Sequence, residues 1–165
     1  MPVIKAYHGS NHIIEKFIHF QKEFTNDQYG PGIYFTNKES LAQGYGKYIY
    51  EVKLDLKGFL TQKSKRDETK LLRIINDNLT ETVLLNYDDN LTRAKRLLLQ
   101  SVLLPRISYI ECLLNIWSDV FNLKNQRFMK ACVENGINGI IEEVSESHGV
   151  LFYMVYNTEN IKWPT

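Results

Sequence analysis

The sequence predicts an α+β fold in which β-strands at both ends of the chain enclose a helical block. Two stretches carry strand patterns: apolar and charged side chains alternate in residues 48–56, and residues 151–156 are apolar throughout. Between them, apolar residues recur three and four positions apart, which is typical of amphipathic helices. We therefore expect a single domain over residues 1–165, with a helical insertion at about 66–134.

The composition is that of a globular domain with nearly balanced charge. The chain has 165 residues and a formal net charge of +1, so no overall field favours nucleic acid and none opposes it. Neither Cys112 nor Cys132 has a metal-ligand partner nearby, and His12 and His19 lack a third ligand, so we expect no metal site. With two cysteines, no long apolar run and no signal-peptide pattern, we expect a cytoplasmic protein that does not enter the membrane.

The first predicted strand, residues 3–7, ends at a potential binding motif. His8 and Gly9 place an imidazole beside an approachable backbone amide, and such a pair can hold a carboxamide and a sugar hydroxyl. The alternative is an ordinary surface turn formed by His8, Gly9 and Ser10. The next stretch, residues 11–20, is expected to form a short helix with one apolar side.

A glycine-rich turn leads into the second predicted strand. Gly30 and Gly32 flank Pro31, and this combination favours a tight turn because glycine reaches backbone angles that other residues avoid. Residues 33–36 are β-branched and aromatic and are expected to form a strand.

The helix expected after this strand presents a second tyrosine. Asn37 is expected to cap a helix over residues 38–46, on which Ala42 and Tyr45 share a face. Tyr34 from the strand and Tyr45 from the helix would then form a slot for a flat heterocycle. The alternative is a core strand packed on an amphipathic helix, with both tyrosines buried.

The remaining elements follow from local patterns. Lys57 and Gly58 are expected to turn the chain into a short strand at 59–61. Helices are expected from Asp67 onward, at 80–85, from Asn90 to before Pro105, at 107–121 and at 125–133, and β-rich segments at 137–144, 151–156 and 161–163. Basic residues around the helices offer either a face for a phosphate-bearing partner or a solvated surface: Lys63, Lys65, Arg66, Lys70, Arg73, Arg93, Lys95 and Arg96.

Three groups of residues occur in a recognisable order, namely Tyr7-His8-Gly9-Ser10, then Gly30-Pro31-Gly32-Ile33-Tyr34-Phe35-Thr36 with Ala42 and Tyr45, then Gly136-Ile137-Asn138-Gly139-Ile140 with Tyr153-Met154-Val155-Tyr156-Asn157 and Ile161-Lys162. This order resembles the ADP-ribosyltransferase superfamily, in the His-Tyr-Glu branch shared by diphtheria-type toxins and poly(ADP-ribose) polymerases. The likeness is greatest to small bacterial and phage members. It covers roughly residues 3–56 and 136–163, and the helical block between them has no counterpart that we can name.

The resemblance implies a split, strongly bent antiparallel sheet that binds NAD as a substrate. His8 matches the histidine that holds the adenine-side ribose, and Gly9 the glycine whose backbone grips the nicotinamide amide. Tyr45 matches the tyrosine that stacks on the nicotinamide ring, and Tyr34 the strand tyrosine of the same pocket. Ala42 stands where many relatives carry a serine that bonds the carboxamide. The implied NAD-binding set also includes Ser10, Gly32, Phe35 and Phe152.

The chain departs from the family at the catalytic glutamate, whose position is taken by Phe152. A carboxylate there would stabilise the oxocarbenium-like transition state, which phenylalanine cannot do. Three interpretations stay open: another acid such as Glu143, Glu146 or Glu159 stands in, a substrate group acts as the base, or the protein binds a nucleotide without chemistry.

Three functions follow from the resemblance. The first is a mono-ADP-ribosyltransferase, a bacterial or phage effector or toxin that passes ADP-ribose from NAD to a protein or nucleic-acid acceptor. The second is a catalytically silent nucleotide- or partner-binding module of the same fold. The third is an NAD-dependent RNA 2′-phosphotransferase, which lacks the glutamate but needs an arginine and further histidines that we cannot match in this sequence.

Overall fold

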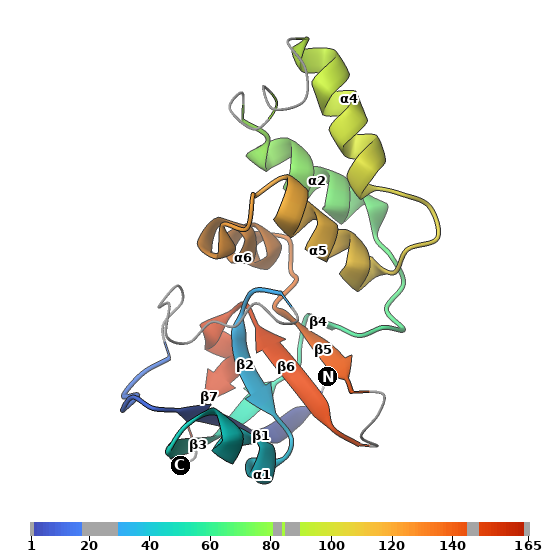
Figure 1. The fold of residues 1–165 in the computed structure, drawn as a ribbon. Helices are drawn as coiled ribbons and strands as arrows, with labels where there is room; N and C mark the ends of the chain where they lie inside the picture. Colours follow the sequence, from blue (N-terminus) through green and yellow to red (C-terminus); the bar gives the residue numbers. More distant parts are fainter. Residues whose placement is uncertain (1, 18–29, 81–83, 85–89, 145–148, 164–165) are drawn as a thin grey trace.

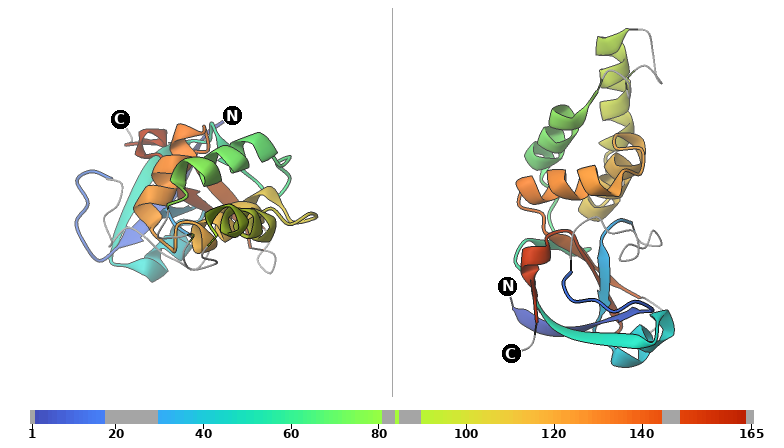
Figure 2. Two further views of the ribbon diagram at one scale, coloured as in Figure 1. Left: turned by 90° about the horizontal axis from the view of Figure 1, so that it is seen from above. Right: turned by 90° about the vertical axis from the view of Figure 1, so that its left-hand side faces the viewer.

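The computed structural model describes residues 2–17, 30–80, 84, 90–144 and 149–163. It confirms the α+β class: a curled seven-stranded sheet carries helices stacked at one end (Figure 1). The right-hand view of Figure 2 agrees that α1 lies at the opposite end of the sheet from the other α-helices. None of the helices in these ranges has both the length and the apolar character needed to cross a membrane.

The strands are distributed over both ends of the chain, and the longer helices lie between β4 and β5. The strands are β1 (Val3–Ser10), β2 (Ile33–Thr36), β3 (Tyr48–Asp55), β4 (Phe59–Leu60), β5 (Gly139–Glu143), β6 (Leu151–Val155) and β7 (Ile161–Lys162). The helices are α1 (Glu39–Ala42), α2 (Glu68–Asn78), α4 (Leu91–Val102), α5 (Tyr109–Asp119) and α6 (Asn125–Glu134), with short 3-10 helices η2 (Gln43–Tyr45) and η3 (Thr158–Asn160).

The strand order is β4-β5-β6-β2-β1-β3-β7. Strands β1 and β3 pair along their whole length, whereas the ladder between β1 and β2 consists of Tyr7 opposite Thr36. The expectation of a purely antiparallel sheet is wrong at one edge, because β4 runs parallel to β5. Parallel neighbours need a long crossover connection, and here the helical block supplies it.

The sheet separates two hydrophobic cores. Successive side chains of β6 point alternately into the two cores. Tyr153 and Val155 pack with Phe35 inside the curl, whereas Phe152 and Met154 pack against the helices. The apolar run at 151–156 is therefore a strand covered on both faces, as its composition predicts.

The helix expected over residues 11–20 is wrong for residues 11–17, which form no helix, and residues 18–20 lie outside the described part of the chain. The Tyr50 hydroxyl accepts a hydrogen bond from the Ile14 N–H (2.6 Å) and donates one to the His12 carbonyl (3.2 Å). These backbone groups are thus satisfied by a side chain of β3 rather than by a helical turn. The expected helix at 80–85 lies mostly outside the described residues.

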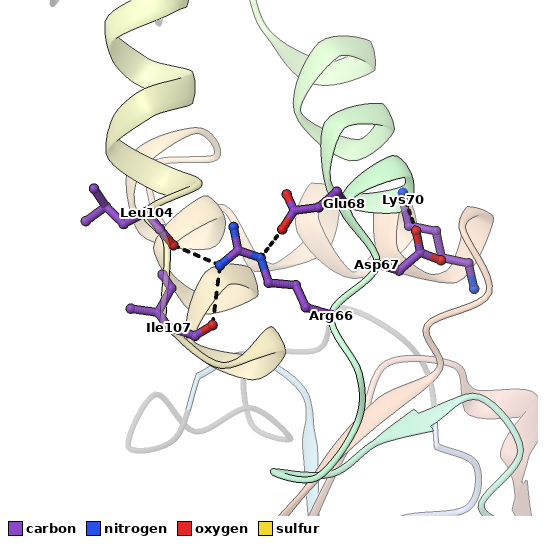
Figure 3. Close-up of polar contacts among 6 residues, drawn as sticks. All are labelled: Arg66, Asp67, Glu68, Lys70, Leu104 and Ile107. Carbon is purple, nitrogen blue, oxygen red and sulfur yellow. Dashed lines mark hydrogen bonds and ion pairs between the residues drawn. The ribbon is translucent and has the colours of Figure 1, made fainter.

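The helical block is tied to its connecting loops by Arg66 (Figure 3). The guanidinium pairs with Glu68 and donates hydrogen bonds to the carbonyls of Leu104 (2.8 Å) and Ile107 (3.3 Å). It therefore links the segment before α2 to the loop between α4 and α5. Asp67, beside it, caps α2 by accepting from the Lys70 N–H at 3.1 Å.

We expect Arg66→Ala to lower the free energy of unfolding by about 1–2 kcal/mol, because two carbonyls lose a charged donor. Urea denaturation measures this change. Lys65→Ala is the matched control, since Lys65 is the exposed preceding residue, and a change of less than about 0.5 kcal/mol is expected there. Equal effects of the two substitutions would contradict the assignment of Arg66 as a brace.

Candidate functional site

Gly9 and the segment that carries Tyr45 are in direct contact. A Cβ built on Gly9 would collide with the Ala42 carbonyl oxygen and lie 3.2 Å from the Tyr45 Cβ. Only a residue without a side chain lets α1 approach β1 this closely. The structure thus brings together three of the residues that the resemblance places around the nicotinamide, namely Gly9, Ala42 and Tyr45.

Tyr34 lies on the same face of the sheet as Gly9. Tyr7 is directly opposite Thr36, so these two side chains share a face. Gly9 is two positions from Tyr7 and Tyr34 is two positions from Thr36, so strand alternation puts both on that same face. The Tyr34 hydroxyl donates to the Gly30 carbonyl at 2.7 Å and closes the loop before β2. That loop needs its glycines, because Gly30 and Gly32 have φ values of 103° and 127°.

The two tyrosines differ in accessibility. Tyr45 is 48% exposed, whereas Tyr34 is half-buried and packs against the helical core. Tyr45 is thus the side chain of the pair that a ligand arriving from solvent would meet first.

His8 points to the other face. Its Nδ1 donates to the Tyr34 carbonyl at 2.6 Å, just beyond the end of the β1–β2 ladder. Its ring packs against Phe17 and Phe35, with centroid distances of 5.3 and 5.4 Å, and the residue is 7% exposed. Burial lowers the pKa of His8, and the hydrogen bond to Tyr34 opposes this in part. In this structure His8 therefore joins the strands, and its ring does not share a face with the tyrosine rings. Ser10 and Phe35 lie on the same side as His8.

Phe152 lies in a cross-strand row with Tyr7, Thr36 and Glu142. Its ring is buried in the core under the helices, so this position presents an apolar side chain to the core and no carboxylate to a ligand. The expected substitutes are not well placed. Glu143 is exposed and alternates to the opposite face, and Glu159 belongs to η3 beyond the other end of β6. Glu146 lies outside the described residues.

Glu142 is the acid that sequence reasoning missed, because only the strand register puts it beside Phe152. Its carboxylate accepts two hydrogen bonds from Gln62 Nε2, at 2.9 and 3.1 Å. Since Gln62 follows β4, these bonds hold the carboxylate toward the β4 edge and away from β2.

The predicted capping role of Asn37 is wrong. Lys38 precedes α1 without a side-chain cap, and the helix expected over 38–46 is divided into α1 and η2. The Asn37 side chain instead accepts from the Leu151 N–H (2.9 Å) and donates to the Gly149 carbonyl (2.7 Å). It thereby fixes the start of β6, and with it Phe152, against the end of β2.

Comparison with known proteins adds little. No family model matches the sequence, and no curated protein matches it. A solved structure described as a crystal structure of an anti-CRISPR protein is similar at 12% identity and a TM-score of 0.42, covering 97% of this chain and 93% of that one. A likeness this weak carries no argument about function. Across the described residues, no cluster of three or more His, Cys, Asp or Glu side chains is arranged to hold a metal.

We expect Gly9→Ala to push α1 away from β1 and to destabilise the fold by about 1–3 kcal/mol. Thermal or urea unfolding measures this. Gly44→Ala is the control, because a Cβ there meets nothing within 4 Å, and it should be neutral or stabilise by up to about 1 kcal/mol. A tolerated Gly9→Ala would contradict the close approach of the two elements.

The lowered pKa of His8 makes folding pH-dependent. As the pH falls below about 6.5, the unfolded chain gains a proton that the folded His8 does not, so stability falls toward the folded-state pKa. We expect a loss of up to about 1 kcal/mol between pH 7.5 and 5.5. The loss should be absent in His8→Asn, whose amide can still donate to Tyr34, and retained in His12→Asn at an exposed position. Identical pH profiles for all three proteins would overturn this.

Proposed function

We propose that the chain is a mono-ADP-ribosyltransferase that binds NAD where β1, β2 and the α1–η2 segment meet. The supporting observation is that Gly9 touches the α1–η2 segment that carries Tyr45 and shares a face of the sheet with Tyr34, next to the point where the β1–β2 ladder ends. A sheet in two groups of strands with this site at their junction is what the ADP-ribosyltransferase resemblance implies.

The local chemistry fits the nicotinamide half of the dinucleotide. The exposed ring of Tyr45 offers a stacking surface for a flat, positively charged pyridinium. Gly9 pairs with Ile49 of β3 and lies beyond the β1–β2 ladder, so the side of its backbone that faces β2 is where a carboxamide would bind. Ala42 supplies no hydroxyl for that carboxamide, so backbone contacts carry its recognition.

Transfer would break the bond between nicotinamide and the ribose C1′, with the electron pair leaving on the nicotinamide nitrogen. The acceptor then bonds to C1′ and loses a proton. Phe152 can neither stabilise the developing positive charge nor accept that proton. We therefore assign the proton to a group of the acceptor, a protein or nucleic acid whose identity the proposal leaves open.

A second candidate is the catalytically silent module, and two observations favour it. Phe152 is buried in the core beneath the helices, and Ala42 removes a contact made in many relatives. Such a protein would bind NAD or a related nucleotide and would release no nicotinamide.

Calorimetric titration with NAD tests binding, and chromatography of released nicotinamide then separates the two candidates. We expect Tyr45→Ala to weaken NAD binding about tenfold, because stacking on an aromatic ring contributes about 1–3 kcal/mol per base. Tyr48→Ala is the control, since Tyr48 is a neighbouring tyrosine whose ring carries Lys47 at 5.0 Å. Binding without nicotinamide release would support the silent module, and absence of NAD binding would overturn the transferase.

A further inference from the structure

We propose that Lys5, Lys53 and Lys162 form an anion site for phosphate groups, and that in the proposed function this site takes the diphosphate of NAD. The assignment of the phosphates to NAD rests on the proposed function. The site itself rests on the register of β1, β3 and β7 and on the charges that this register brings together.

The three lysines form one cross-strand row. Lys5 of β1 is directly opposite Lys53 of β3, and Lys53 is directly opposite Lys162 of β7. Directly opposite residues share a face of the sheet, and their Cα atoms lie about 4.5–5.5 Å apart. All three lysines are exposed, so their ammonium groups can meet one ligand that arrives from solvent.

The lysine row points away from the core inside the curl. Lys53 stands between Val52 and Leu54, which are both buried in that core, so alternation turns Lys53 to the outer face. The core beneath the helices includes residues of β5 and β6 but none of β1, β3 or β7, three strands that the structure describes in full. The row is therefore covered by neither core.

The positive charges of the row are not balanced by the acids around them. Like charges directly opposite each other destabilise a sheet. Glu51 pairs with Lys5, at 3.4 Å between Oε1 and Nζ. Asp55, the next acid on this face of β3, accepts from a backbone N–H two residues later. Among the described residues neither Lys53 nor Lys162 forms an ion pair, so a bound anion would relieve their repulsion.

Protection of the sheet edge explains only part of the row. Lysines on edge strands oppose pairing with another chain, and Lys162 lies on the edge strand β7. Lys5 has no such role, because β1 lies between β2 and β3. Lys53 likewise has a paired neighbour on each side. A ligand therefore accounts for the row better than protection of an edge does.

The lysine row shares a face of the sheet with the proposed nicotinamide site. Lys5 is four positions before Gly9 on β1, so alternation puts both on one face, about 13 Å apart along the strand. The ion pair with Glu51, which stands opposite Tyr7, turns the Lys5 ammonium toward Gly9. In NAD the diphosphate follows the nicotinamide ribose. A dinucleotide with its carboxamide at Gly9 can thus bring its phosphates to the lysines by running along β1.

Calorimetric titrations with NAD and with inorganic pyrophosphate test the site. The variants are Lys53→Gln and Lys162→Gln, with Lys53→Arg to keep the charge. Lys130→Gln on α6 is the control for net charge, because Lys130 is exposed and lies outside the row. We expect both glutamine variants in the row to bind each ligand about three- to fivefold more weakly, the size expected for one exposed charge pair. Lys53→Arg and the control should bind as wild type does, and added NaCl should reduce the difference.

Thermal unfolding supplies a readout of opposite sign. Because the row is repulsive, Lys53→Gln should raise the midpoint of the ligand-free protein by about 1–2 °C. Pyrophosphate should raise the midpoint of wild type more than that of Lys53→Gln, since it binds the folded row. A lysine that only supports its strand would show the reverse, namely a lower midpoint and unchanged binding.

The outcomes separate the anion site from the proposed function. Equal affinities for NAD and pyrophosphate in wild type and both glutamine variants of the row, or equal weakening in Lys130→Gln, would overturn the site and leave the proposed function standing. Weaker binding of pyrophosphate alone would overturn the assignment of the site to NAD. Pyrophosphate binding that depends on Lys53, without any binding of NAD, would overturn the transferase and leave a site for another phosphate-bearing ligand. If wild type binds neither, both proposals are overturned.

Discussion

The junction between β1 and β2 is the constraint on which the rest of the structure depends. The two groups of strands are joined there by Tyr7 opposite Thr36, and just beyond this pair His8 donates to the Tyr34 carbonyl. The curl brings Ala6 and Val52 of one group into the same core as Phe35 of the other. Apolar burial inside the curl therefore supplies cohesion that a short ladder cannot, and it leaves the edge of β1 near Gly9 outside the β1–β2 ladder.

The helical block and the identity of residue 152 are physically connected. The core beneath the helices extends onto the sheet through Phe152, Met154 and Tyr156. A carboxylate at position 152 would lie against that apolar cluster, where an ionised group without a partner is costly. Burial already raises the pKa of Tyr156 well above its ordinary value in the same region. The helices packed over this face thus favour a hydrophobic residue at 152, the position at which the ADP-ribosyltransferase resemblance would place a glutamate.

Much of the fold was predictable because it is encoded locally. Alternation in residues 48–56 and the apolar run at 151–156 mark β3 and β6. The helix expected from Asn90 is α4, and Asn90 caps it by accepting from the Arg93 N–H. The features that were missed depend on distant partners. Asn37 has the residue type of a helix cap, yet its bonds go to a strand 114 positions later. The position of Glu142 beside Phe152 requires a register that no local pattern contains.

The candidate site shows the same division. The strand predicted to end at Tyr7 runs on to Ser10, so Gly9 lies within β1 and not in a turn after it. Its missing side chain is what allows the close approach of the Tyr45 segment. The face on which His8 lies was not predictable, since it depends on Phe17 from a segment whose conformation is set by Tyr50.

This placement changes what a substitution at His8 can reveal. Because His8 closes the junction between two groups of strands, its removal would disturb the sheet whether or not the protein binds NAD. Tyr45 supports no comparable junction and is nearly half exposed, so its removal acts on the surface and not on the core. The exposed tyrosine, rather than the buried histidine, is therefore the position at which binding can be separated from folding.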